Sequence, residues 1–299
     1  MSKNPSTLSV VFVLLLGILA FLVAGCAQAT VVTPEPTTVT IAGSTAMRPV
    51  LAELTDQFSQ QHPDVLFSIQ GGGSTLGETW VAEGQVDLAG STLPPSPAQE
   101  AAAQERGLFR VPIALDGLAI VVHASNPVSE LALFQLRNLY SGRFLDWKEV
   151  EGRPGEVLLV SREDGSGSRI FFEERVMGEE RVSLTAVVMP SSGDVVAYVA
   201  DHPGAIGYVS RAYVIDLLNA SEPSEEPGGG EHGPADVKVL ALEGLLPTQE
   251  NLAAQSYPLT RPLYLVTRGE PQGQVRQFID FVLSPQGQGI VAAYHVPIR

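Results

Sequence analysis

The chain has 299 residues, of which 44 % are hydrophobic and 17 % charged, a composition typical of a globular protein with enough apolar side chains for one or two domains. Its formal net charge is −15, and its only lysines are Lys3, Lys148 and Lys238. Proteins that bind nucleic acid present a basic face, so this charge argues against a nucleic acid partner. The overall field of such a chain repels an anion, so an anion site in it has to rely on local dipoles.

The N-terminal segment reads as an export signal. Lys3 precedes an apolar run over residues 8–24, which small residues then connect to Cys26, the only cysteine of the chain. At about 17 residues the run is at the lower limit for crossing a bilayer, so an uncleaved transmembrane anchor is the alternative. The stretch resembles a bacterial lipobox. By that resemblance residues 1–26 are a signal peptide, Cys26 is lipidated and anchors the protein to the membrane, and residues 27–37 are a polar tether.

From residue 38 onward, short β-branched runs alternate with helical patterns. The predicted strands are 39–42, 66–70 and 86–89, and the predicted helices that follow them are 47–60, 76–83 and 97–106. The first of these helices has Val50, Leu51, Leu54 and Phe58 on one face. This alternation predicts βαβ units and a mainly parallel sheet.

Two apolar runs, 108–115 and 118–123, follow with only Asp116-Gly117 between them, and they are long enough to cross from one lobe of a protein into another. A second α/β set comes after them. Its predicted strands are 157–160, 205–209 and 262–267, and its predicted helices are 131–140, 168–176, 195–200 and 274–283. Residues 219–236 are acidic and rich in glycine and proline, which predicts a mobile loop.

A glycine-serine turn recurs where a predicted strand gives way to a helix. It appears as Gly43-Ser44-Thr45, as Gly71-Gly72-Gly73-Ser74-Thr75 and as Gly165-Ser166-Gly167-Ser168. The first amides of a helix have no partner within it and carry partial positive charge, so an anion is stabilised there without a lysine. One such turn is ordinary helix capping, whereas three in one chain favour an anion site.

Arg162 stands shortly before the third turn and adds a planar donor that grips an oxyanion through two bonds. Asp164 is placed to hold this guanidinium, although a plain surface ion pair is the alternative. Nucleotide motifs are missing: there is no G-x-x-x-x-G-K-[ST], and no lysine lies near these glycines. No cluster of His, Cys or carboxylates has metal-ligand spacing, so we expect neither a metal nor a cofactor.

With these residues in view, the chain resembles the periplasmic phosphate-binding proteins of ABC uptake systems from about Thr38 to the C-terminus. The similarity is strongest over residues 161–169, an Arg-x-Asp-Gly-Ser-Gly block in which Ser168 replaces the family's usual threonine. The stretches 43–46, 71–75, 86–92, 111–117 and 204–208 support it.

The resemblance implies an α/β fold of the type II periplasmic-binding-protein class. Two lobes, each a mainly parallel sheet flanked by helices, enclose the ligand in the cleft between them. Lobe I is expected over 38–117 and 258–299, and lobe II over 118–257. The protein is expected to be an extracytoplasmic monomer that passes phosphate to the permease and ATPase of an ABC importer.

Carried over by position, the ligand-binding residues come from both lobes, and Asp164 orients Arg162. The donors expected on the first lobe are Ser44, Thr45, Ser74 and either Ser91 or Thr92. Those expected on the second lobe are Arg162, Ser166, Gly167 and Ser168.

The sequence departs from the family at Ser91-Thr92-Leu93. Members commonly place there an aspartate that accepts the phosphate proton, or a Ser-Arg pair. A site without an acceptor discriminates poorly between protonated phosphate and sulfate, although a hydroxyl such as that of Thr92 is able to accept. Sulfate, molybdate and tungstate therefore stay open as ligands.

Two other functional classes stay open. A serine hydrolase using Ser74 or Ser166 needs a histidine base, and the five histidines lie outside every motif. We therefore expect no enzyme activity. An anion sensor or scaffold that serves no transporter would have the same binding site, so the sequence does not separate it from a transport protein.

Overall fold

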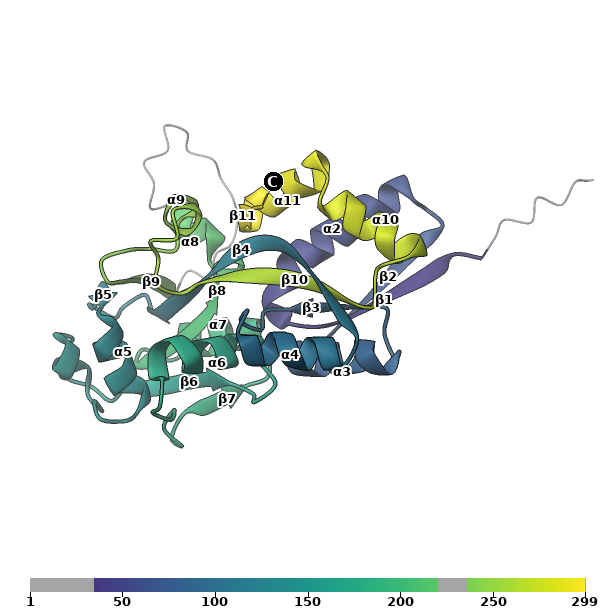
Figure 1. Ribbon diagram of the computed structural model, residues 1–299. Helices are drawn as coiled ribbons and strands as arrows, with labels where there is room; N and C mark the ends of the chain where they lie inside the picture. Colours follow the sequence, from purple (N-terminus) through teal and green to yellow (C-terminus); the bar gives the residue numbers. More distant parts are fainter. Residues whose placement is uncertain (1–34, 220–235, 299) are drawn as a thin grey trace, which may run out of the picture. The chain divides into compact units, whose positions relative to one another are not determined.

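The computed structural model describes residues 35–219 and 236–298 (Figure 1). Cys26, the predicted signal peptide, most of the predicted tether and all but the two ends of the predicted acidic loop lie outside the described residues. Everything below concerns the part from Pro36 onward, which forms one unit by its contacts.

The described strands and helices follow the predicted alternation and add several short elements. The strands are β1 (Thr37–Gly43), β2 (Val65–Gly72), β3 (Leu88–Ser91), β4 (Leu108–His123), β5 (Glu130–Leu131), β6 (Leu158–Arg162), β7 (Val187–Met189), β8 (Ala205–Ser210), β9 (Val237–Leu242), β10 (Thr260–Arg268) and β11 (Val296–Pro297). The helices are α2 (Arg48–Gln61), α3 (Ser74–Glu83), α4 (Pro97–Glu105), α5 (Leu133–Tyr140), α6 (Gly167–Phe172), α7 (Ser192–Asp201), α8 (Ile215–Asn219), α9 (Gln249–Ala253), α10 (Gly273–Val282) and α11 (Pro285–Tyr294).

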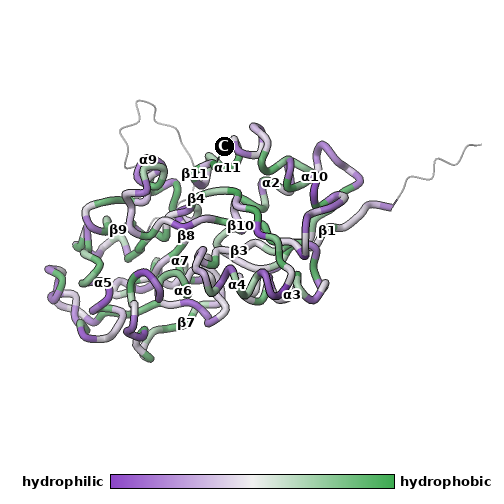
Figure 2. The backbone as a smooth tube through the Cα atoms, in the orientation of Figure 1, coloured by the Kyte–Doolittle hydropathy of each residue, from purple (hydrophilic) through white to green (hydrophobic). Residues whose placement is uncertain are grey.

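Local sequence accounts for these elements where it is strongest. Helix α2 has a proline in its first turn and buries the predicted apolar face of Val50, Leu51, Leu54 and Phe58. Helix α4 is largely exposed, with hydrophilic residues that are purple in Figure 2, and only Ala103 of it is buried. The helix predicted over 168–176 continues from α6 as a π-helical turn, Glu173–Met177.

The sheet is mixed, with the strand order β2-β1-β3-β10-β4-β8-β6-β7. Strands joined by helical crossovers pair in parallel, as predicted: β1 with β2 and β3, and β6 with β7 and β8. Strands β10 and β4 lie between the two parallel sets in this order, and each is antiparallel to its main-path neighbours. The parallel arrangement therefore holds within each set and not between them.

Strand β4 is a single strand that takes in both predicted apolar runs together with Asp116-Gly117. Its first half pairs with β10, and its second half pairs with β8 and β9. Strand β10 also pairs with β3, so the C-terminal part of the chain returns to the sheet that begins with β1 (Figure 1). Two strands thus connect the halves of the sheet.

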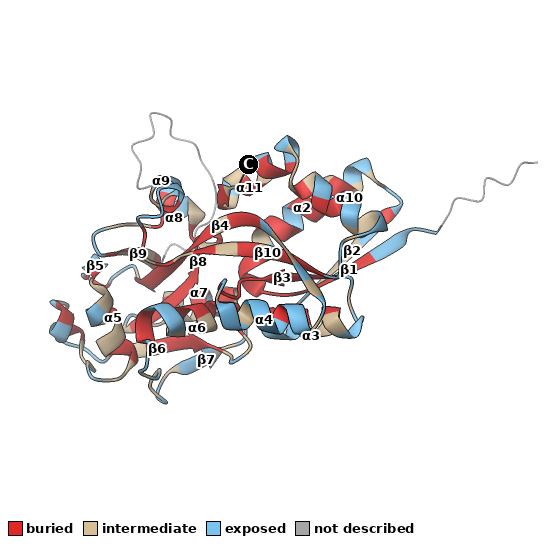
Figure 3. Cartoon of the chain, in the orientation of Figure 1, coloured by how far each residue is buried: buried red, intermediate tan, exposed pale blue. Residues whose placement is uncertain are grey.

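Buried side chains gather in separate cores along this sheet. One core takes residues between 39 and 114 and between 263 and 291, where α2, α10 and α11 cover the strands. Two others take residues between 118 and 259, together with Val296. Figure 3 shows β8 and the second half of β4 mostly in the red of buried residues, and every residue of β8 is buried. The lobe boundaries at 117/118 and 257/258 remain a prediction.

Candidate functional site

The three glycine-serine turns meet. The Gly73 amide donates to the Gly43 carbonyl at 3.1 Å, and the Thr75 amide donates to the Gly165 carbonyl at 3.1 Å. Strands β1 and β2 are parallel neighbours, so their carboxyl ends reach the same edge of the sheet and bring the first two turns together. The third turn arrives from β6, in the other half of the sheet.

Three buried hydroxyls lie together at this point, and we call Ser44, Ser74 and Thr92 the hydroxyl cluster. The Thr92 Oγ1 is 3.2 Å from the Ser44 Oγ and 3.3 Å from the Ser74 Oγ. The Thr92 amide donates to the Ser74 Oγ at 3.0 Å. Because Ser74 Oγ accepts this bond, its own hydrogen stays available for another acceptor.

The start of α6 lies directly against the hydroxyl cluster. A Cβ atom at Gly167 would lie 2.5 Å from both the Ser74 Oγ and the Thr92 Oγ1, so only glycine fits. Ser166 is the N-cap of α6, and its Oγ accepts from the Arg169 amide at 3.4 Å. The first-turn amides of α6 have no partner within the helix and carry the positive end of its dipole.

Arg162, at the end of β6, is 2 % exposed and reaches across to the first turn. Its Nη2 donates to the Thr45 Oγ1 at 3.2 Å, and its Nη1 donates to the Ser192 Oγ at 3.0 Å. Its Nε also donates to the Met189 carbonyl at 3.1 Å. The guanidinium is therefore fixed beside the hydroxyls of both halves of the sheet.

The expectation that Asp164 orients Arg162 is wrong. Asp164 lies in the turn after β6 with 93 % of its side chain exposed, and it pairs with Arg169 at 2.6 Å. Glu163 holds Arg162 instead: its Oε2 accepts from Nε and its Oε1 from Nη2, both at 2.9 Å. The chain turns immediately after β6, so the residue next to Arg162 folds back onto the guanidinium while Asp164 faces solvent.

Of the two alternatives at the end of β3, the structure brings Thr92 to the cluster and not Ser91. The Ser91 hydroxyl donates to the Glu78 Oε1 at 2.6 Å, and the Glu78 carboxylate also pairs with Arg110 at 2.8 Å. Successive side chains of a strand point to opposite faces, which is why only one of the two residues reaches the turns.

Ser168 is buried beside the same turns, but its contact is with a residue that sequence reasoning missed. Its Oγ accepts from the Arg261 Nη1 at 3.0 Å. Arg261 also pairs with Asp116 through Nη2 at 2.9 Å, and both side chains are fully buried. Burial raises the pKa of Asp116, but Arg261, His295 and Ser210 outweigh it, and the pKa falls to about 2.

Ser192 and Tyr213 also contact the first turn and were missed. The Ser192 amide donates to the Thr45 Oγ1 at 3.2 Å, and the Tyr213 hydroxyl donates to the Thr45 carbonyl at 2.6 Å. Ser192 belongs to a Ser-Ser-Gly stretch at the start of α7, so a search for further serine-glycine turns before helices would have found it. Nothing in the sequence points to Tyr213.

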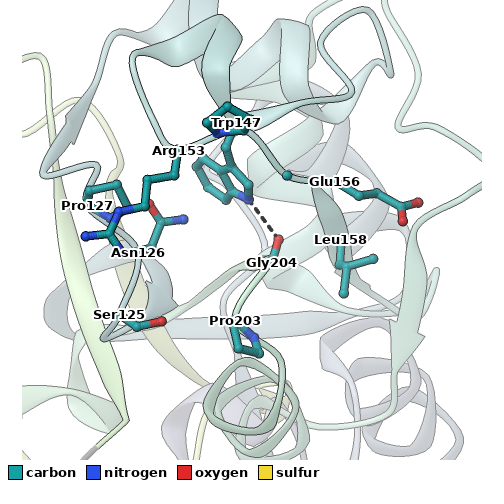
Figure 4. Close-up of a pocket in the computed structure, with 11 residues that line it drawn as sticks. Ser125, Asn126, Pro127, Trp147, Arg153, Glu156, Leu158, Pro203 and Gly204 are labelled. Carbon is teal, nitrogen blue, oxygen red and sulfur yellow. Dashed lines mark hydrogen bonds between the residues drawn. The ribbon is translucent and has the colours of Figure 1, made fainter.

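An open pocket of about 400 Å³ lies elsewhere (Figure 4). Trp147, Arg153, Pro203 and Gly204 are among its lining residues, and the Trp147 Nε1 donates to the Gly204 carbonyl at 3.0 Å. No member of the hydroxyl cluster lines it, and Trp147 is itself packed in a core. The pocket is therefore separate from the candidate site.

The described residues offer neither a metal site nor a membrane-spanning helix. They contain no group of three or more His, Cys, Asp or Glu residues placed to hold a metal ion. No helix among them is long and apolar enough to cross a bilayer. The apolar run over 8–24 lies outside the described residues.

Known proteins share this sequence pattern and this fold. Residues 29–286 match the PBP superfamily domain. The phosphate-binding protein PstS of Bacillus subtilis is 28 % identical over 246 residues, which cover 82 % of this chain and 75 % of the relative.

Two solved structures are similar at 30 % identity. One is a candidate phosphate ABC transporter substrate-binding protein of Clostridium perfringens with bound phosphate (TM-score 0.76, covering 88 % of this chain and 100 % of that one). The other is an ABC-type phosphate transport receptor of Vibrio cholerae (TM-score 0.64, covering 86 % and 99 %). These similarities confirm the expected α/β fold of the type II binding-protein class. The chain belongs to the PBP superfamily.

Proposed function

We propose that this protein is an extracytoplasmic binding protein that captures inorganic phosphate and delivers it to the permease and ATPase of an ABC importer. The similar proteins of Bacillus subtilis, Clostridium perfringens and Vibrio cholerae are named for phosphate binding or phosphate transport. Lipidated Cys26 anchors the chain to the membrane, and the protein acts as a monomer.

The observation that carries this proposal is the meeting of one buried guanidinium with the hydroxyls of three helix starts. Arg162 donates to Thr45, and Gly167 lies against Ser74 and Thr92. An oxyanion that enters between these groups exchanges its water shell for charge-assisted hydrogen bonds and helix dipoles, which suits a chain almost without lysine.

The proposed ligand donors on one side are Ser44, Thr45, Ser74 and Thr92, and those on the other side are Arg162, Ser166, Gly167 and Ser168. Glu163 takes the orienting role that the sequence assigned to Asp164. Ser91 is left out because Glu78 holds its hydroxyl.

The contacts also support a binding protein over a hydrolase. Ser74 bonds to Thr92 and Ser166 to the Arg169 amide, and among the described residues no histidine hydrogen-bonds to either serine. A serine nucleophile needs such a base. The PBP superfamily is a family of solute-binding proteins.

Phosphate is the favoured anion because two groups beside Arg162 and the hydroxyl cluster are able to accept its remaining proton. Thr92 has a hydroxyl with lone pairs. The Glu163 carboxylate lies beside the second turn, because its Oε1 is 3.2 Å from the point where a Cβ atom added to Gly73 would stand. Sulfate at neutral pH has no proton to donate to them.

Titration calorimetry on the full-length protein in detergent tests this proposal, with phosphate, arsenate, sulfate and molybdate as ligands. We expect phosphate and arsenate to bind and sulfate to bind at least about tenfold more weakly. Tighter binding of sulfate or molybdate would assign the site to that anion, and no binding of any of them would refute an oxyanion site.

Deletion of the chain separates transport from sensing. Loss of phosphate uptake by the cells supports delivery to an importer, whereas normal uptake with altered phosphate signalling supports a sensor. Cys26→Ser is expected to move the protein from the membrane fraction to the soluble fraction if the lipid is its anchor.

A further inference from the structure

A buried set of contacts connects the candidate site with the two strands that join the halves of the sheet. Arg261 of β10 stands directly opposite Asp116 of β4 in the antiparallel ladder. Its Nε and Nη2 donate to the Asp116 Oδ2 at 3.1 and 2.9 Å. Its third nitrogen, Nη1, donates to the Ser168 Oγ at 3.0 Å. One guanidinium thus joins β4, β10 and the first turn of α6.

The direction of this guanidinium is fixed on several sides. The other oxygen of Asp116, Oδ1, accepts from the Ser210 hydroxyl at 2.8 Å and lies 3.2 Å from the His295 Nδ1. The Arg261 Cζ lies 5.7 Å from the centre of the Phe171 ring. Asp116 and Arg261 are both fully buried, so neither side chain turns toward water without breaking a paired charge.

This arrangement decides which way the Ser168 hydroxyl is able to bond. A serine hydroxyl has one hydrogen and two lone pairs, and here Arg261 occupies a lone pair. The hydrogen of Ser168 therefore points away from Arg261. A hydroxyl that is already oriented as a donor suits a charged oxyanion oxygen. A freely rotating hydroxyl would first have to lose its rotational freedom on binding, which weakens the affinity.

We propose that Arg261 is a positioning residue of the anion site: held by Asp116, it fixes the Ser168 hydroxyl as a donor to the bound oxyanion. The inference rests on the proposed function, because it assigns Ser168 to the same ligand. Arg261 itself does not contact the anion, and its charge is balanced by Asp116.

The competing explanation is that the Asp116–Arg261 pair only stabilises the sheet. A double-mutant cycle separates the two explanations, because a positioning residue loses its effect once the residue it positions is removed. The pair is best replaced as a unit, Asp116→Asn with Arg261→Met, so that no charge is left unpaired near the ligand.

The experiment measures phosphate affinity by calorimetry for the full-length wild type, Ser168→Ala, the pair variant and the combination of all three substitutions. We expect Ser168→Ala to weaken binding about tenfold, the pair variant to do nearly the same, and the combination to be no weaker than about tenfold. A combined loss near a hundredfold, the product of independent effects, overturns the proposal. So does a pair variant that melts at a lower temperature yet binds phosphate as the wild type does.

Arg261→Lys is the second variant in case the pair variant does not fold. Lysine keeps the charge beside Asp116 but lacks the planar fork that reaches Ser168 as well, so its loss of affinity should also disappear in the Ser168→Ala background. An unchanged affinity for Arg261→Lys overturns the proposal. Arg137→Met is the control. The Arg137 guanidinium donates to the Val176 carbonyl, so the phosphate affinity of this variant should stay within about twofold of that of the wild type.

A failure of this inference is distinguishable from a failure of the proposed function. If the wild type binds no phosphate, the proposed function is refuted. If the wild type binds phosphate and the cycle is additive, only the role of Arg261 is refuted.

Discussion

Two buried arginines lie near the candidate site, and their carboxylate partners differ. Arg162 pairs with Glu163, its neighbour in sequence, which keeps 29 % of its side chain exposed. Arg261 pairs with Asp116, which is far away in sequence and fully buried. A partly hydrated partner gives way to a ligand at small cost, whereas a fully buried partner does not. The first pair is therefore suited to binding and the second to holding the scaffold.

The largest expected effect comes from breaking the scaffold pair. Asp116→Asn leaves Arg261 without a counter-charge and should lower the free energy of unfolding by about 3 to 5 kcal/mol at pH 7, measured by urea denaturation. A loss below about 1 kcal/mol would contradict the structural role of this pair.

The Asp116 carboxylate should also make the free energy of unfolding depend on pH in acid. The pKa of Asp116 lies at about 2 in the folded protein, below its ordinary value of 3.8, so its charged form stabilises the fold. This contribution, about 2 kcal/mol, is complete above about pH 4 and is lost as the pH falls through 2. The difference in unfolding free energy between the wild type and Asp116→Asn should therefore shrink by about 2 kcal/mol as the pH falls from 4 to 2. A constant difference between pH 7 and pH 2 would show that Asp116 does not titrate in this way.

Breaking the pair of Arg162 and Glu163 should lower the affinity for phosphate. Arg162→Ala removes a charged donor and should weaken phosphate binding by about 10- to 100-fold, corresponding to about 1.5 to 3 kcal/mol, by calorimetry. The matched control is Arg276→Ala, which breaks the exposed ion pair with Asp280 and should leave the affinity unchanged. Equal affinities for the wild type and Arg162→Ala would remove Arg162 from the site.

The smallest effect is expected at Asp164, which pairs with Arg169 in water and not with Arg162. Asp164→Asn should change phosphate affinity by less than about twofold. A loss as large as that of Arg162→Ala would restore the orienting role that the sequence suggested for Asp164 and refute the one assigned to Glu163.

The sequence was most informative where the signal is local. Helix α2 buries the predicted face, and each glycine-serine turn stands at the start of a helical segment, because capping and apolar spacing act over a few residues. The order of motifs also identified the family. The sequence did not distinguish Ser91 from Thr92, or Glu163 from Asp164, because neighbouring residues differ in the direction of their side chains and not in chemistry.

By itself, then, the amino-acid sequence determined an α/β chain with three potential anion-binding turns and one arginine beside them. Only the tertiary structure decided that Thr92 joins Ser44 and Ser74, that Glu163 holds Arg162, and that Arg261 and Asp116 support Ser168. The physical reason is distance along the chain. Arg261 and Asp116 are 145 positions apart, and the register of β4 against β10 sets them face to face.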